Sequence, residues 1–362
     1  MGKISSSFSC RAAQYLTATR GSAPEIRICY ERAEALCHSL KRPRPLYVAL
    51  TGQWRYSLFT DKLSTTMAIA KRIYSLAQEQ NDSTLVMGAC TALAATVYYL
   101  GDFETAQQYE MRGLQIWRSG RASSAFEEVD SQAVTCLCHR AIFEWYFGEI
   151  VPCRATMAES IALAKELNDM HGLAVVFHFA AIVAYFERNP AETERLASEL
   201  IELATRNNFA HFLAFGAVHR GWARAAGGDA AEGISCIEDG IRDYRATGAI
   251  LALPFFLALK AEALLLAGRT SEALEVVNDA EALAERFEQR VYYAELHRLR
   301  GVFLAALGAD ETQIEASFCE AIRIAKEQKS ISLEKRAEGT YAEYRRQKAG
   351  GSGGRGFRLP LW

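Results

Sequence analysis

Two features recur along this chain about every 40 residues: a small residue and, seven positions later, a residue that ends a helix. The helix-ending positions are Gly101, Gly148, Arg188, Gly228, Gly268 and Gly308, at intervals of 47, 40, 40, 40 and 40 residues. The small residues before them are Ala94, Ala141, Ala181, Gly221, Ala261 and Gly301. A fixed period of this length is typical of stacked helical hairpins that bury their apolar faces against their neighbours. The sequence therefore predicts an all-α fold, a right-handed α-solenoid of antiparallel helix hairpins with repeats of about 40 residues.

The segment 83–118 shows how one hairpin is encoded. Its apolar residues follow the i, i+3, i+4, i+7 spacing of a single helical face, at Cys90, Leu93, Ala94 and Val97. Gly101 tolerates the left-handed backbone that ends a helix, and Asp102 favours the positive N-terminal end of the next helix. Small residues allow the two helices to pack closely. The same arrangement predicts hairpin breaks near 60, 101, 148, 188, 228, 268 and 308.

The repeats divide the chain into three parts. Residues 1–43 form an N-terminal segment in which 24–39 is expected to be the second helix of a truncated repeat. Residues 44–348 form a solenoid of about seven hairpins and end in a capping helix over 331–348. Residues 349–362 form a flexible, glycine-rich tail. The longer interval of 47 residues predicts an exposed insertion near 118–130, which contains Ser-Gly-Arg-Ala-Ser-Ser.

Composition limits the kinds of partner and compartment. Lys and Arg number 41 and Asp and Glu 43, a formal net charge of −2, which argues against a nucleic-acid binder. Nine dispersed cysteines indicate reduced thiols in a cytoplasmic protein. The most apolar stretches, near 171–186 and 251–268, are interrupted by polar residues, so neither is expected to span a membrane.

Two local motifs are expected to carry no chemistry. Residues 351–356 match Gly-x-Gly-x-x-Gly, but the strand and helix that a dinucleotide site needs are not predicted around them. Cys136, Cys138 and His139 cannot all point the same way on a helix, and structural zinc prefers two residues between paired cysteines. We therefore predict no metal, no cofactor and no catalytic residues.

The repeat also has a recognisable signature. In the unit of Gly268, small or apolar residues follow at +5, +9 and +12, which are Ala273, Val277 and Ala280. Together with the small residue at −7, this pattern resembles tetratricopeptide repeats over residues 44–348, although the usual period is about 34.

Three short sequence segments point to a more specific group of repeat proteins. They are Arg220-Gly-Trp-Ala223, Tyr244-Arg-Ala-Thr-Gly-Ala249 and Ala294-Glu-Leu-His-Arg-Leu-Arg-Gly301. They resemble the C-terminal repeat region of bacterial signalling proteins that join a class III adenylate cyclase or a winged-helix DNA-binding domain to a STAND-type ATPase. The phosphate loop and the strand-rich cyclase domain of those proteins are absent from this sequence. The resemblance therefore implies a repeat module without the catalytic domains.

The resemblance implies that ligands bind in a concave groove lined by the first helix of each repeat. The groove positions carry a series of aromatic residues and one histidine: Trp54, Tyr98, Tyr99, Trp145, Tyr146, His178, Tyr185, Phe186 and Trp222. Aromatic side chains provide contact area at a low cost in conformational entropy, which suits ligand capture. The alternative is that these rings pack between the helices, and that His178 and His219 are structural.

These observations predict a non-catalytic module of bacterial signal transduction that binds a protein, a peptide or a small effector. The alternative is a regulatory or sensor arm of an adenylate cyclase or STAND ATPase that is encoded separately or lost by truncation. The segment 357–362, Phe-Arg-Leu-Pro-Leu-Trp, is either a docking peptide or a disordered end. The sequence leaves the oligomeric state and the identity of the ligand open.

Overall fold

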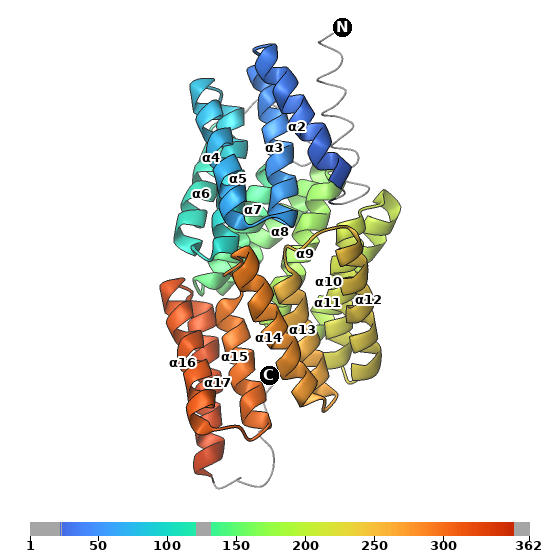
Figure 1. The fold of residues 1–362 in the computed structure, drawn as a ribbon, viewed down its shortest axis with the longest axis vertical. Helices are drawn as coiled ribbons and strands as arrows, with labels where there is room; N and C mark the ends of the chain where they lie inside the picture. The colour runs from blue at the N-terminus through green and yellow to red at the C-terminus, as the bar shows by residue number, and fades with distance from the viewer. Residues whose placement is uncertain (1–21, 23, 121–131, 351–362) are drawn as a thin grey trace.

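The computed structural model describes residues 22, 24–120 and 132–350, and within them the chain forms sixteen helices and no strand (Figure 1). The helices are α2 (Pro24–Ser39), α3 (Pro43–Thr60), α4 (Leu63–Glu79), α5 (Ser83–Leu100), α6 (Phe103–Arg118), α7 (Gln132–Tyr146), α8 (Ile150–Glu166), α9 (Met170–Phe186), α10 (Pro190–Asn207), α11 (Ala210–Ala226), α12 (Ala230–Ala246), α13 (Leu253–Leu266), α14 (Thr270–Phe287), α15 (Tyr293–Ala306), α16 (Glu311–Glu327) and α17 (Ile331–Ala349). Consecutive helices pack against each other along the stack. The predicted all-α solenoid of antiparallel hairpins is confirmed.

Each expected break falls between the two helices of a hairpin, from α3/α4 to α15/α16. At the second break Gly101 has a φ of 88°, and the Asp102 side chain accepts the backbone N–H of Thr105 at 3.1 Å. Gly101 thus ends the first helix in the left-handed backbone that the sequence predicts, and Asp102 caps the start of the next helix through a side-chain hydrogen bond. The Gly-rich match at 351–356, the segment 357–362 and most of the expected insertion lie outside the described residues.

Small residues bring the helices of a hairpin into backbone contact. A Cβ added to Gly221 of α11 would lie 2.6 Å from the carbonyl oxygen of Gly233 on α12. A Cβ added to Gly233 would lie 2.5 Å from the carbonyl oxygen of Gly221. Because these distances are shorter than any normal Cβ contact, only glycine fits at this crossing. The recurrent small residue is therefore a packing requirement of the hairpin.

The solenoid turns back so that its C-terminal hairpins meet its N-terminal ones (Figure 1). Helices α3 and α5 end in carbonyls that lack partners within the helix. The Phe59 carbonyl accepts the N–H of Ile250, and the Tyr99 carbonyl accepts the N–H of Arg290, both at 2.8 Å. At the end of α7, the Tyr146 carbonyl accepts the Ser330 hydroxyl at 3.1 Å. Loops preceding α13, α15 and α17 thus bind the ends of α3, α5 and α7.

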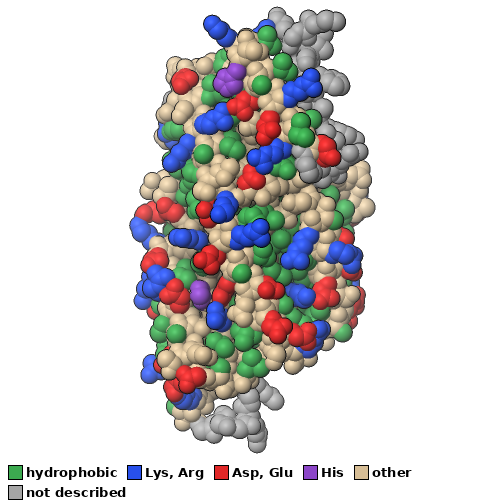
Figure 2. Space-filling model, in the orientation of Figure 1, with side chains coloured by type: hydrophobic (Ala, Val, Ile, Leu, Met, Phe, Trp, Pro, Cys, Tyr) green, Lys and Arg blue, Asp and Glu red, His purple; other side chains and the backbone are tan. Residues whose placement is uncertain are grey.

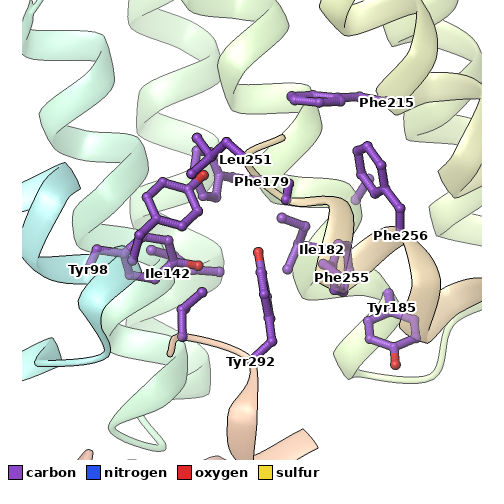
Figure 3. Packing of buried hydrophobic residues seen from close by; sticks show 14 of the residues in the cluster. Tyr98, Ile142, Phe179, Ile182, Tyr185, Phe215, Leu251, Phe255, Phe256 and Tyr292 are labelled. Carbon is purple, nitrogen blue, oxygen red and sulfur yellow. The ribbon is translucent and has the colours of Figure 1, made fainter. Parts of the chain in front are cut away.

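Side chains from these loops also fill the interior of the turn. Figure 3 shows Leu251 and Tyr292, from the loops before α13 and α15, directed into the same cluster as Tyr98 and Ile142. Tyr98 and Tyr292 retain only 1% and 2% of their exposure. Where Tyr98 and Tyr292 lie, the first helices of the repeats therefore face a packed core.

The outer surface is charged, and the long apolar helix α5 is buried in the fold. On the face shown in Figure 2, cationic and anionic side chains are interspersed and form no large patch of one sign. In the described part of the chain, α5 alone is long and apolar enough to span a membrane. Because 78% of that helix is buried in the fold, repeat packing accounts for its apolar character.

Candidate ligand-binding cavity

The structure divides the nine residues predicted to line a groove into two sets. All nine are buried, with exposed fractions between 0% and 8%. Three of them, Trp54, Tyr99 and His178, line one cavity. The other six, Tyr98, Trp145, Tyr146, Tyr185, Phe186 and Trp222, do not line it.

This cavity lies between the first helices of successive repeats. It has a volume of about 180 Å³, and residues of α3, α5, α7, α9 and α11 line it. The aromatic part of its wall includes Trp54, Phe59, Tyr99, Phe179, Phe212 and Phe215. Four histidines complete the wall: His139, His171, His178 and His211. Among the described residues that line the cavity, none is Asp or Glu, and Arg55 is its one basic residue other than histidine.

His178 belongs to a pair of neutral imidazoles. Its Nδ1 lies 3.1 Å from Nε2 of His219, and both rings are buried. Burial, and next the proximity of His219, hold the pKa of His178 well below its ordinary value, and burial lowers the pKa of His219 to about 3. His219 Nδ1 has no hydrogen-bond partner among the described residues. Since an orphaned buried N–H is rarer than an orphaned acceptor, His219 Nε2 is the donor, and His178 then carries its hydrogen on Nε2.

His211 lines the cavity on the side of α3. Its ring stacks on Phe59 with a centroid distance of 4.8 Å. Burial, and then the neighbouring His171, lower the pKa of His211 to about 4. Its Nε2 is buried with no partner in the described part of the chain, so the hydrogen of the neutral ring belongs on Nδ1 by the same argument.

His139 is positioned by an acid behind the cavity wall. Its Nδ1 lies 2.6 Å from Oε1 of Glu110, a fully buried residue of α6. A carboxylate can only accept hydrogen bonds, so Nδ1 of His139 donates. The ring also meets Phe179 edge to face, with centroids 5.4 Å apart. His139 is thus held against the cavity wall by Glu110 and Phe179.

Tyr185 and Trp222 belong to a buried charge network. Tyr185 Oη and Trp222 Nε1 each donate to Glu262 at 2.9 Å, and Arg188 binds the same carboxylate through two nitrogens at 2.5 and 2.8 Å. Burial acts to raise the pKa of Glu262, but Arg188 and Arg298 outweigh it, so the pKa is lowered. These aromatic groups are thus hydrogen-bonded within the protein.

The same network continues across the turn of the solenoid. Glu295 accepts two hydrogen bonds from Arg298, at 2.7 and 2.8 Å, and is also bound by Arg336 of α17. Arg336 donates as well to the carbonyl of Phe186 at 3.2 Å. The network therefore ties α9 to α15 and α17.

The remaining predicted residues pack on one another. Trp145 stacks on Phe186 with centroids 4.4 Å apart, and the hydroxyls of Tyr98 and Tyr146 lie 3.3 Å apart. Cys136 and Cys138 are buried core thiols, and no group of three or more His, Cys, Asp or Glu side chains in the described ranges is placed to hold a metal ion.

Sequence reasoning missed His139, His171 and His211 as cavity residues. Two of them occupy the same position of the repeat: His171 and His211 each stand ten residues before the small residue of their unit. Equivalent repeat positions lie at equivalent heights on neighbouring helices. The spacing could therefore have placed these two histidines together, but it gave no sign that a cavity lies between them.

Comparisons with known proteins place the chain among helical repeat proteins. A family model described as ANAPC5, anaphase-promoting complex subunit 5, matches residues 101–185 and 270–336, less than half of the chain. An uncharacterized protein of Rhizobium meliloti (strain 1021), R02095, is 25% identical over 276 residues, or 76% of this chain. The chain spans only 27% of the length of that relative.

Two solved structures are similar in fold. A Rap protein complexed with Competence and Sporulation Factor has a TM-score of 0.59 at 9% identity, and the match covers 97% of this chain and 99% of that one. Bacillus thuringiensis PlcR, in complex with the peptide PapR7 and DNA, has a TM-score of 0.47 at 15% identity, with coverage of 77% and 99%. The likeness to the Rap protein shows that the helical stack follows a known architecture along almost its whole length.

Proposed function

We propose that this chain is a non-catalytic binding module that takes a peptide or a small effector into the cavity of Trp54, Tyr99 and His178. The observation that carries the proposal is a cavity of about 180 Å³ with aromatic walls and imidazole groups, held between five helices. Sites of this kind, mostly apolar with a few placed polar groups, are typical of small-ligand pockets. The Rap protein, which shares the fold, was solved in complex with Competence and Sporulation Factor.

The wider role that we propose is in bacterial signal transduction in the cytoplasm, without a nucleic-acid or membrane partner. The near balance of 41 basic and 43 acidic residues supports this choice of partner. The resemblance to repeat regions of STAND-type signalling proteins supports the context.

A test of the cavity uses a variant that fills it. Ala95 lines the cavity from α5, so Ala95→Leu puts an isobutyl group into the empty volume. The matched control is Ala191→Leu on the exposed side of α10. Thermal-shift screening with short peptides and metabolites is expected to find ligands that stabilise the wild type and Ala191→Leu but not Ala95→Leu. Ligands that stabilise all three proteins equally would contradict the proposal.

The second candidate is a regulatory arm of an adenylate cyclase or STAND ATPase. One observation favours it: the R02095 relative is much longer than the matched segment, so related repeats occur within a larger protein. Neighbouring reading frames that encode a cyclase or an ATPase would be purified and mixed with this chain. A change in their turnover rate is expected, and an unchanged rate would count against this role.

A further inference from the structure

We propose that the cavity binds an uncharged aromatic ring that carries a carboxamide, either as a free aromatic amide or as an aromatic residue of a peptide with its adjoining amide group. This inference rests on the proposed binding function and names the ligand chemistry. Four features of the cavity support it: its size, its aromatic walls, the neutrality of its imidazoles, and the presence of both donor and acceptor nitrogens on them.

The volume limits the ligand to a single ring. An apolar cavity of about 150 Å³ is enough to take up benzene in another protein. The cavity here, at about 180 Å³, has room for such a ring and a small substituent. A fused polycyclic ligand would require the walls to move apart, which a core packed at crystal-like density resists.

The walls combine aromatic rings with imidazoles. The ring of Phe179 meets His139 edge to face with centroids 5.4 Å apart, and it lies 5.3 Å from the ring of His178. Phe215 lies 4.2 Å from the ring of His178 and meets Phe212 edge to face at 5.6 Å. Aromatic rings favour such arrangements because of their quadrupoles. A ligand ring in the cavity therefore meets aromatic side chains that lie directly beside the imidazole groups.

The cavity offers little to stabilise a charged ligand. Burial, and next the proximity of His219, hold the pKa of His178 well below its ordinary value, and burial and then His171 lower the pKa of His211 to about 4. Both imidazoles are therefore uncharged at neutral pH. None of the described lining residues is acidic, and Arg55 already interacts within the protein. Moving a carboxylate or a cation from water into such a site costs more free energy than moving a neutral amide.

The imidazoles present both kinds of hydrogen-bonding group. His178 carries its hydrogen on Nε2, because its Nδ1 accepts from Nε2 of His219 at 3.1 Å. Nδ1 of His139 donates to Glu110 at 2.6 Å, which leaves Nε2 of the neutral His139 ring as an acceptor. Nε2 of His211 is also an acceptor and has no hydrogen-bond partner among the described residues.

A carboxamide complements this mixture of groups. Its oxygen accepts hydrogen bonds and its NH2 group donates two, whereas a carboxylate only accepts and an amidinium only donates. A ligand of one kind leaves some buried polar groups without a partner, which weakens its binding.

Isothermal titration calorimetry on the full chain with matched probes tests the proposal. Benzamide, benzoate and benzamidine share a ring and a planar substituent and differ in charge. We expect benzamide to bind about tenfold more tightly than either charged probe. It should bind about fivefold more tightly than acetophenone, in which a methyl group replaces the NH2 group.

A variant tests the imidazole donor. His178→Phe should weaken the binding of benzamide about fivefold, whereas His38→Phe, at an exposed position outside the cavity, should not. The comparison of probes on the wild type needs no variant, so it tests the proposal even if His178→Phe does not fold.

A second arm distinguishes the two sources of the ligand. N-acetylphenylalaninamide is compared with benzamide. Tighter binding of the former indicates a peptide, and tighter binding of benzamide indicates a free aromatic amide; both outcomes support the proposal.

Binding of benzoate, benzamidine or acetophenone as tight as that of benzamide would overturn the inference, as would the absence of binding by both amides. If ligands from the screen need an open cavity but show no preference for uncharged amides, only this inference fails. If Ala95→Leu changes the binding of no ligand at all, the proposed function fails with it.

Discussion

Arg188 stands where glycine ends the first helix in five other hairpins, and it adopts the same left-handed backbone with a φ of 57°. A side chain at such a φ costs about 1–2 kcal/mol. The guanidinium of Arg188 forms an ion pair with the buried Glu262. Backbone strain at one residue is thus offset by a charge pair with another hairpin.

Replacing Arg188 by glycine separates these two effects. We expect Arg188→Gly to lower the free energy of unfolding by about 2–4 kcal/mol, because the loss of a buried partner outweighs the relief of strain. Urea denaturation measures the change. The control is Asn168→Gly, at a left-handed position with an exposed side chain, which should alter stability by less than about 0.5 kcal/mol. An Arg188→Gly protein as stable as the wild type would show that the pair contributes nothing.

The buried histidines make stability depend on pH. The folded state lowers the pKa of His211 to about 4 and that of His219 to about 3, so the unfolded chain binds more protons between these values and the ordinary pKa near 6.5. Stability is therefore complete above about pH 6.5 and is lost as the pH falls toward 4. His211→Phe should reduce this slope by up to about 1.4 kcal/mol per pH unit, as urea denaturation at several pH values would measure. The exposed His38→Phe serves as control, and an unchanged slope in His211→Phe would contradict the assignment.

At the scale of the helix, the repeat depends on close contact between the two members of a hairpin. The contact between α11 and α12 is made by Gly221 and Gly233, whose backbones leave no room for a Cβ. Elsewhere along the stack alanine is tolerated at the same repeat position, as at Ala181 and Ala261. The size of side chain that fits at this repeat position therefore depends on the residue that faces it on the other helix of the hairpin.

This packing predicts that a glycine-to-alanine substitution changes the free energy of unfolding in opposite directions on α11 and on α17. Gly221→Ala should lower the free energy of unfolding by about 1–3 kcal/mol, because α11 and α12 must separate. Gly339→Ala on α17, where a Cβ would meet nothing within 4 Å, should raise it by about 0.5–1 kcal/mol through helix propensity. Thermal denaturation of both variants gives the comparison. Destabilisation by both would mean that the hairpin contact is not the cause.

At the scale of the whole molecule, the stack departs from the one-dimensional behaviour of an open solenoid. Repeats of such proteins contact only their neighbours. Here the loop before α15 binds the end of α5 through Arg290 and Tyr99. Tyr185 of α9 also donates a hydrogen bond to Glu295 of α15 at 3.4 Å. Distant repeats are therefore expected to unfold together.

Truncation of Tyr292 tests this coupling. Tyr292→Ala should cost about 3–5 kcal/mol and reduce hydrogen-exchange protection in α5 and α7 as well as in α15, since its ring packs in the interior of the turn. Ile314→Ala on α16 also removes a buried side chain but should reduce protection mainly in α15 and α16. If the amides of α5 and α7 remain protected from exchange in Tyr292→Ala, the N-terminal and C-terminal repeats do not unfold together.

The sequence by itself determined the helices, their breaks and the solenoid class. Each of these depends on residues close in the chain, such as Gly101 with Asp102, or on a period repeated from unit to unit. The return of the stack onto itself was decided only by the tertiary structure, because it depends on contacts such as that of Arg290 with Tyr99. That return buries Tyr98, Tyr146 and Tyr185, although their repeat positions resemble those of a groove. It also packs Leu251, from the C-terminal half, at the cavity of Trp54 and His178.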